Sequence, residues 1–478
     1  MLQSAMRPVA WMMLLAYAVL LTAVLGDFRA VMGDEACYVD PALRWCEGKG
    51  WTSTAWGQPP DEVWASNVPL YALSVAAWVK VTGLDSLWGL RLWSLVLYAA
   101  GLALWVSGAR CAGWLLSSAQ QAGFLALLAG SLYATGPSQY ARPEALGTLL
   151  LGFALWGQTL RSGRWRYVTA FLAGLLASWA GLQFAVALTV FGMVWLLVCG
   201  GQPWRNLLVC GAGGLLGLVI LCGLYHSAGV LGVFVAETFG AGANRSAQWH
   251  GWRDPTLWAG AAVLLAGLLC GAWGATERRL ALAGLLAGPG LALALFALSK
   301  FPQYYASLAI LPLATAVCAV FPSIAQKWRP AGFALVVSAG LIGFPLAALM
   351  NWNAMPGRQH EELRQWMESA LAGKKAVFVD PSAYFAARSA DREIYTQFVL
   401  EALDAADAGR IEAAVLVPNH GLAYLRKEEV LGQLGGTWRL VRTYPEGAQP
   451  ASRISRLDFL SGLSYSGPYV FEMWQRER

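Results

Sequence analysis

The chain has 478 residues, of which 57% are apolar and only 13% are charged. A soluble domain carries about 25% charged residues, so this composition indicates an integral membrane protein. No basic patch with interleaved aromatic residues accompanies the net charge of +6, which argues against a nucleic-acid partner.

Apolar runs long enough to cross about 30 Å of hydrocarbon follow one another along the chain. The first begins soon after Arg7 and is similar to a signal peptide, but it is long and lacks a small-residue cleavage site before Asp27, so we interpret it as a retained span. We predict about eleven spans, at residues 9–26, 88–108, 113–134, 144–160, 166–181, 184–199, 206–226, 255–275, 280–298, 303–321 and 331–350.

The distribution of Arg and Lys sets the predicted orientation. With a cytoplasmic N-terminus every inner loop carries a positive charge, as the positive-inside rule requires; these residues are Arg110, Arg161, Arg164, Arg166, Arg205, Arg278, Arg279, Lys327 and Arg329. An even number of spans would break this agreement. We therefore predict a multi-pass protein of the inner (cytoplasmic) membrane, with its long first loop and its tail on the periplasmic side.

The first outer loop, residues 27–87, contains an apolar segment, 67–82, that is too short for a further span and ends near Lys80. We expect it to form an interfacial or re-entrant helix. Cys37 and Cys46 also lie in this loop, where an oxidising compartment permits a disulfide. If one helix covers both, however, they are about 13 Å apart, which is too far to bridge.

The sequence pattern of the C-terminal tail predicts a second structural unit. We place a transmembrane unit at residues 1–355 and an extracytoplasmic α/β unit at 356–478. In the tail, apolar strand-like runs alternate with helix-like stretches; the strands are expected at 376–379, 413–417 and 438–441, and the helices at 358–371, 395–407 and 421–433. It has no glycine-rich nucleotide motif, zinc spacing or nucleophile elbow, which favours a packing or acceptor-handling role over catalysis. The expected fold class is therefore an all-α polytopic membrane protein with a small C-terminal α/β unit.

The most informative polar residues stand at the outer boundary, beginning with Asp34 and Glu35 just after the first span. An acidic residue at a helix start also caps the helix and suits its dipole, so capping is the alternative interpretation. A second cluster opens the fourth span, where Arg142 and Glu144 flank the helix-starting Pro143. Because the predicted topology brings both segments to one face, we expect them to share a site.

Later outer segments add polar residues to the same face. Lys300 precedes Tyr304 and Tyr305 at the start of a late span, and it either reaches toward lipid headgroups or holds a lipid phosphate. Glu237 adds a carboxylate to another outer loop.

Carboxylates beside Arg and Lys at the rim of an apolar bundle suit glycosyl transfer from a lipid-linked sugar phosphate. A carboxylate takes the proton of an acceptor hydroxyl or amine as it attacks the anomeric carbon. Cations stabilise the phosphate that departs with its lipid. We therefore predict a glycosyltransferase in which Asp34 is the base, Glu35 and Glu144 support it, and Arg142 and Lys300 face the phosphate.

At these residues the sequence resembles the GT-C glycosyltransferase superfamily, most closely the branch of protein O-mannosyltransferases and lipid A aminoarabinose transferases. The resemblance covers roughly residues 9–350; the segments that carry it are Asp34-Glu35, Pro69-Leu70-Tyr71, Arg142-Pro143-Glu144 and Lys300-Phe301-Pro302-Gln303-Tyr304-Tyr305. It implies a polyprenyl- or dolichyl-phosphate sugar donor, transfer on the outer face, and inversion at the anomeric carbon.

Residue by residue, the resemblance implies that Asp34 is the catalytic or acceptor-binding acid and Glu35 its acidic neighbour. It implies that Arg142 and Glu144 form the second polar cluster, and that Lys300 and Tyr305 line the donor pocket. One departure stands before the Pro-Leu-Tyr segment: relatives often carry a lysine beside paired prolines, whereas this chain has Ser66-Asn67-Val68-Pro69. Lys80 or Arg91 is a candidate substitute for that phosphate contact.

The main rival is a membrane transporter or lipid flippase, and a non-catalytic scaffold is a third interpretation. Transporters place ionisable groups near the bilayer midplane and often have repeated halves, whereas the span centres here carry no Asp, Glu, Lys or Arg. Carboxylates at a phosphate site can hold Mg²⁺, but no ligand spacing requires a cofactor. The acceptor, a lipid, a glycan or a protein, and the sugar are not specified by the sequence.

Overall fold

The computed structural model describes most of the chain outside the N-terminal segment; the described residues are 25–199, 203–240, 251–270, 273–300, 303–324, 328–343, 345, 348–349, 351–352, 355–418, 425–445 and 468–477. The predicted first span therefore lies almost entirely outside the described residues.

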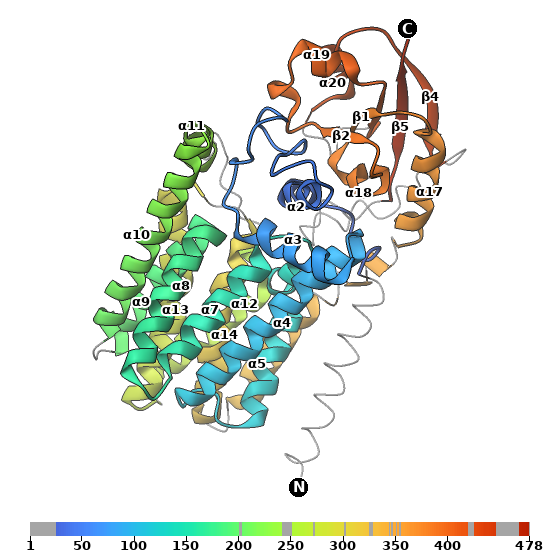
Figure 1. Ribbon diagram of the computed structural model, residues 1–478. Helices are drawn as coiled ribbons and strands as arrows, with labels where there is room; N and C mark the ends of the chain where they lie inside the picture. Colours follow the sequence, from blue (N-terminus) through green and yellow to red (C-terminus); the bar gives the residue numbers. More distant parts are fainter. Residues whose placement is uncertain are drawn as a thin grey trace.

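A bundle of helices forms one end of the molecule (Figure 1). Its members overlap the second to eleventh predicted spans; they are α4 (Leu87–Cys111), α5 (Ser118–Gly130), α6 (Leu132–Thr135), α7 (Glu144–Gln158), α8 (Gly163–Ala180), α9 (Leu182–Cys199), α10 (Pro203–Ser227), α12 (Pro255–Leu269), α13 (Ala275–Ala297), α14 (Ala306–Val320) and α15 (Arg329–Ile342).

Within the described part of the chain, four helices are long and apolar enough to cross a membrane by length and composition: Leu87–Cys111, Trp204–Ser227, Ala275–Ala297 and Ala306–Ser323. Shorter apolar helices such as α9 and α12 stand beside them. The chain is thus a multi-pass membrane protein, and the count of eleven spans stays a prediction. Gly181, with φ of 154°, forms a tight turn that joins α8 to α9.

Helices α4 and α7 pack so closely that only glycine fits between them. A Cβ on Gly152 would lie 2.2 Å from the carbonyl oxygen of Gly101, and a Cβ on Gly101 would lie 2.6 Å from the backbone nitrogen of Leu149. Small residues allow such backbone approach between membrane helices. The contact matters for the site because α7 begins at Glu144.

We expect Gly152→Val to destabilise the bundle, because the added side chain must push α7 away from α4. Overpacking of this kind costs about 1–3 kcal/mol. The measurement is the Tm of the purified protein in detergent, with Gly163→Ala as the control, since a Cβ at that exposed position meets no atom within 4 Å. Equal Tm values for both variants would contradict the close-packing argument.

The first outer loop forms α2 (Gly33–Cys46) and α3 (Leu70–Thr82), which lie at one end of the bundle between it and the C-terminal sheet (Figure 1). The short helix α3 agrees with the predicted 67–82 segment. Cys37 and Cys46 both lie in α2 and are free thiols. This agrees with the expectation that one helix covering both cysteines places them too far apart for a disulfide.

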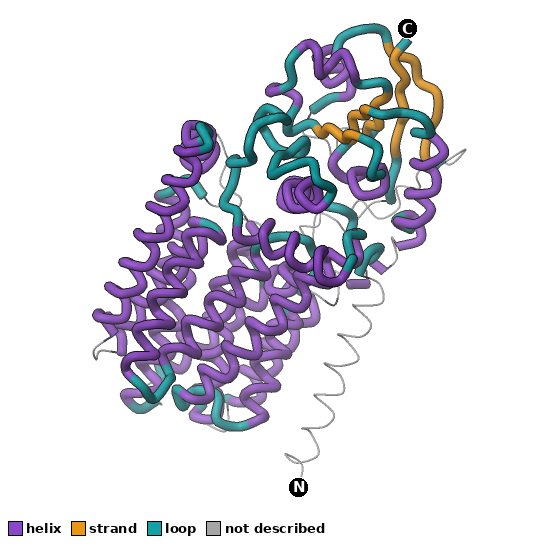
Figure 2. Tube along the Cα trace, in the orientation of Figure 1, coloured by secondary structure: helices purple, strands orange, loops and turns teal. Residues whose placement is uncertain are grey.

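The C-terminal segment forms a five-stranded mixed sheet in the order β2-β1-β3-β5-β4. The strands drawn in Figure 2 all lie together at one end of the molecule. Its strands are β1 (Ala376–Val379), β2 (Glu393–Thr396), β3 (Ala413–Leu416), β4 (Trp438–Tyr444) and β5 (Phe471–Arg476). β1 pairs in parallel with β2 and β3, whereas β5 pairs antiparallel with β3 and β4. Its helices are α17 (His360–Ala370), α18 (Tyr384–Ala387), α19 (Ala405–Arg410) and α20 (Lys427–Leu434).

Three of these strands match the predicted ones, but the helix expected at 395–407 is wrong. That stretch begins in the last residues of β2 and ends in α19, with a 3-10 turn at Leu400–Ala402 between them.

Polar contacts fasten this C-terminal unit to α2. The buried Asp40 carboxylate accepts hydrogen bonds from the Tyr384 hydroxyl and, at 2.8 Å, from the Ser53 hydroxyl. Burial raises the pKa of Asp40, against the lowering effect of Arg44 nearby. Arg44 in turn pairs with Glu393 of β2 at 2.5 Å. The helix that carries Asp34 is therefore held by the bundle on one side and by the sheet unit on the other.

His360, the first residue of α17, gives this region a pH dependence. Its backbone N–H donates to the Asp27 carboxylate at 2.8 Å, and burial lowers the pKa of its imidazole from 6.5. Below pH 6.5 the unfolded chain takes up a proton that the folded chain resists, so stability should fall as the pH decreases through this range. We expect the Tm of His360→Gln to fall less than that of the wild type between pH 7 and pH 5; identical slopes would contradict this role.

Candidate active site

Arg142 is the centre of the polar cluster at the end of the bundle nearest α2. Its guanidinium lies 3.1 Å from the Asp34 carboxylate and 3.0 Å from the Glu144 carboxylate, and a second contact to Glu144 measures 3.2 Å. The ring of Tyr304 faces the same guanidinium, with its centroid 4.2 Å away. The structure thus brings four of the predicted site residues together from three distant segments.

Local sequence explains how each carboxylate reaches this point. Asp34 lies in the first turn of α2, and Glu144 is the first residue of α7, after Pro143. Carboxylates are favoured at helix N-termini, where unpaired backbone N–H groups and the helix dipole give positive potential. Arg142, just before α7, is therefore placed between two helix starts.

Exposure separates the roles of the two carboxylates. The Asp34 side chain is 30% exposed, whereas the side chains of Glu144 and Arg142 are 5% and 3% exposed. Glu144 is thus buried against Arg142, and Asp34 is the carboxylate that an incoming molecule can reach.

Glu35 faces a different partner. Its carboxylate, which is 0% exposed, pairs with Arg91 of α4 through contacts of 2.8 and 2.9 Å. It also accepts hydrogen bonds from the backbone N–H of Met32, at 2.8 Å, and of Ala141, at 2.7 Å. The alternative interpretation of helix capping therefore describes Glu35. The bond to Ala141 links the start of α2 to the residue that precedes Arg142.

The basic residues named as substitutes for the missing lysine have other partners. Arg91 is 0% exposed and donates to backbone carbonyls such as those of Arg29 and Ala30, at 2.9 and 3.2 Å, as well as to Glu35. The suggestion that Arg91 contacts the donor phosphate is therefore wrong. Lys80 is exposed and lies over the ring of Trp45, 3.8 Å from its centroid.

Burial and charge set the protonation of the cluster. Burial alone would lower the pKa of Arg142, but the carboxylates of Glu144 and Asp34 raise it well above its ordinary value. Burial raises the pKa of the Tyr38 and Tyr304 phenols. Both phenols are therefore neutral and are not bases.

The remaining predicted residues lie around this centre with different neighbours. Tyr305 is buried and packs edge-to-face on Tyr304, with ring centroids 4.7 Å apart. Lys300 is half-buried just after α13, where its backbone N–H donates to Leu295 at 2.8 Å. Glu237 lies against the first outer loop, because its carboxylate is 3.8 Å from the position of a Cβ on Gly57. The donor-binding roles of these residues stay predictions.

Tyr38 is a site residue that the sequence prediction does not include, although helix spacing points to it. Its ring centroid lies 5.8 Å from the Arg142 guanidinium. Residues four apart share one face of a helix, so Tyr38 follows from Asp34 once α2 is recognised. The described residues bring together no group of three or more His, Cys, Asp or Glu side chains suited to a metal ion.

The helical bundle, the acid-bearing loop helix and the small C-terminal sheet together define a multi-pass membrane protein with the GT-C fold expected from the sequence. Two crystal structures of ArnT from Cupriavidus metallidurans share this arrangement. The structure bound to undecaprenyl phosphate has a TM-score of 0.54 and 15% identity, covering 85% of this chain and 93% of that chain. The apo structure has a TM-score of 0.59 and 16% identity, covering 86% and 93%. Comparison with protein-family models and with characterised proteins finds no match.

Proposed function

We propose that the protein is an inverting glycosyltransferase that moves a sugar from a polyprenyl-phosphate donor to an acceptor on the extracytoplasmic face. The observation that carries the proposal is the cluster in which buried Arg142 holds one buried carboxylate, Glu144, and one accessible carboxylate, Asp34. A fold shared with ArnT, which has been crystallised with undecaprenyl phosphate, supports a lipid-phosphate donor.

In the proposed reaction the accessible Asp34 carboxylate accepts the proton of the acceptor hydroxyl or amine. The acceptor oxygen or nitrogen forms a bond to the anomeric carbon from the face opposite the phosphate. The bond between that carbon and the phosphate oxygen breaks, and the electron pair leaves with the polyprenyl phosphate. Arg142, already positive and buried, stabilises the charge that develops on the leaving phosphate, with Lys300 as a second cation.

Glu35 has a positioning role in this proposal rather than a role in proton transfer. Its oxygens are occupied by Arg91 and by two backbone N–H groups, so it fixes the start of α2 against the 141–142 backbone. That contact sets the direction in which Asp34 leaves the helix.

The site also bears on the rival transporter. A transporter needs ionisable groups near the middle of the membrane, whereas Asp34, Arg142 and Glu144 lie at helix starts at one end of the bundle. The direct test is transfer of a radiolabelled sugar from undecaprenyl phosphate by the purified protein in detergent, with acceptor lipids, glycans and peptides supplied separately. Product formation supports the transferase, and its absence with every acceptor class, under conditions that keep the protein folded, contradicts it.

We expect transfer to proceed without an added divalent metal. The Arg142 guanidinium occupies the space between the Asp34 and Glu144 carboxylates, and it supplies the positive charge that Mg²⁺ would otherwise bring to the phosphate. Transfer rates in buffer with EDTA and in buffer with Mg²⁺ should therefore agree. A loss of activity in EDTA that Mg²⁺ restores would contradict this expectation.

A further inference from the structure

A cavity of about 460 Å³ lies in the bundle, outside the polar cluster described above. It is lined by residues of α4, α7, α8, α9, α10, α13 and α14. Its residues on α7 run from Leu151 to Gln158, at the opposite end of that helix from Glu144. At 1.5 Å per residue, the nearest lining residue on α7, Leu151, is about 10 Å from Glu144 along the helix axis, and Gln158 is about 21 Å away. The cavity is therefore separate from the proposed catalytic cluster.

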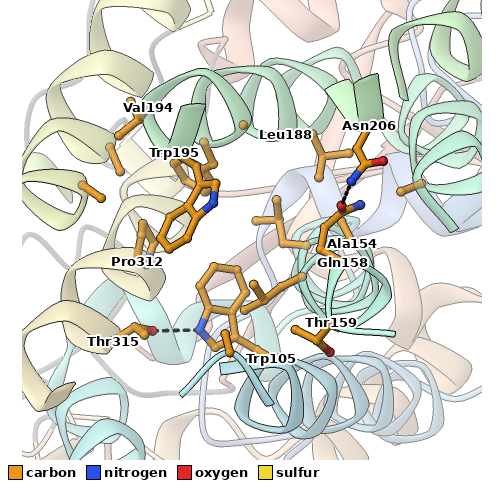
Figure 3. A pocket seen from close by; sticks show the side chains of 18 of the residues that line it. Trp105, Ala154, Gln158, Thr159, Leu188, Val194, Trp195, Asn206, Pro312 and Thr315 are labelled. Atoms are coloured by element: carbon orange, nitrogen blue, oxygen red, sulfur yellow. Dashed lines mark hydrogen bonds between the residues drawn. The ribbon is translucent and has the colours of Figure 1, made fainter. Parts of the chain in front are cut away.

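The inner wall of the cavity is apolar. Figure 3 shows Trp105, Leu188, Trp195 and Pro312 around the space. The indole N–H of Trp105 already has a hydrogen-bond partner, because it donates to the Thr315 hydroxyl at 2.8 Å. A wall of this kind accepts a hydrocarbon chain, and the volume lies within the range of about 300–1,000 Å³ of small-molecule pockets.

One end of the cavity is polar. Gln158 ends α7, Arg166 lies in the first turn of α8, and Asn206 lies in the first turn of α10. The Asn206 amide donates to the Gln158 amide oxygen, as the dashed line in Figure 3 marks. Arg166 donates to the Leu160 carbonyl at 2.5 Å, which holds its guanidinium at the rim. Amides and a guanidinium at the end of an apolar space suit an amphiphile and not a plain hydrocarbon.

The rim also carries positive potential. Helices α8 and α10 run side by side from this end, and a Cβ on Gly174 of α8 would lie only 1.9 Å from the carbonyl oxygen of Cys210 of α10. Two helix N-termini therefore meet here, and each favours an anion. Arg205, which is exposed, lies in the first turn of α10.

We propose that this cavity binds an acyl chain of an anionic phospholipid from the leaflet opposite the catalytic face, with the lipid phosphate at Arg166, Gln158 and Asn206. The arginine-rich loops at this end are the ones that the positive-inside rule places in the cytoplasm. The tail of a polyprenyl donor has no polar group to match this rim, whereas a phospholipid has both parts. The proposal stands independently of the transferase activity.

The test is native mass spectrometry of the full-length protein in detergent supplemented with dioleoylphosphatidylglycerol. We expect the wild type to retain one lipid molecule, and Arg166→Gln to retain it about tenfold more weakly, since one charge-assisted contact is worth about 1.4 kcal/mol or more. Arg164→Gln is the matched control, because it removes an exposed arginine that does not line the cavity. Ala154→Phe should also prevent retention by filling the cavity, whereas Ala100→Phe, on an exposed position of α4, should not.

The probes distinguish the sources of the phosphate. Equal retention by wild type, Arg166→Gln and Ala154→Phe would overturn the proposal. Two further results would overturn it. One is retention of dioleoylphosphatidylcholine, which carries no net charge, equal to that of dioleoylphosphatidylglycerol. The other is a rise in Tm with glycerol phosphate alone that equals the rise with dioleoylphosphatidylglycerol. Displacement of the phospholipid by undecaprenyl phosphate in wild type would assign the cavity to the donor tail instead, and would also overturn it.

Discussion

We expect Asp34→Asn to reduce sugar transfer by about 10²–10⁴-fold, the range typical of losing a general base. The substitution keeps the size of the side chain and its place beside Arg142, but the amide cannot accept the acceptor proton. The measurement is the initial rate of transfer of radiolabelled sugar from undecaprenyl phosphate by purified wild type and variant.

Folding must be separated from chemistry in this comparison. The Asp34–Arg142 contact is partly exposed, and pairs of that kind contribute about 0–1 kcal/mol, so the Tm should change little. Asp61→Asn is the matched control, because Asp61 is an exposed acid of the same outer loop. Near-normal transfer by Asp34→Asn would reject this residue as the base, even if the protein proves to be a transferase.

The second large effect concerns stability. We expect Arg91→Met to destabilise the protein by about 3–5 kcal/mol, because it leaves the Glu35 carboxylate buried without its charged partner. The variant also frees the backbone carbonyls of residues 25, 26, 29 and 30 that Arg91 contacts. Thermal unfolding in detergent should report a large fall in Tm, together with loss of transfer activity.

A double variant tests the cause. Arg91→Met combined with Glu35→Leu removes the buried charge as well as its partner, so it should recover part of the lost stability. Arg364→Gln serves as the control, since Arg364 pairs with Glu361 on an exposed helix face, where such pairs contribute little. If Arg91→Met unfolded at the wild-type temperature, the buried pair would not hold α2 in place.

The bundle was predictable because the membrane fixes the length of an apolar helix, so unbroken runs such as 206–226 lead directly to α10. The sheet was harder to predict. β2, with four residues, is too short to show strand alternation, and the apolar residues near it also fit a helical period. β5 is set by its antiparallel partners β3 and β4, which no local pattern reveals.

At the site, residue types and the shared face were predictable, but individual directions were not. Successive helix residues point about 100° apart, so neighbouring acids on α2 meet different partners. Asp34 faces Arg142 and keeps some exposure, whereas Glu35 faces Arg91 and is fully buried. Only the packing of α4 against the first loop separates a reachable carboxylate from a structural one.

The proposed function depends on Asp34, Arg142 and Glu144 forming one pocket beside the phosphate of a polyprenyl donor. A cryo-electron microscopy structure of the protein in nanodiscs with undecaprenyl phosphate tests it most directly. We expect the phosphate within hydrogen-bond distance of Arg142 or Lys300, with the Asp34 carboxylate open to the space beside it. A phosphate bound elsewhere on the protein, with the cluster unchanged, would contradict the account.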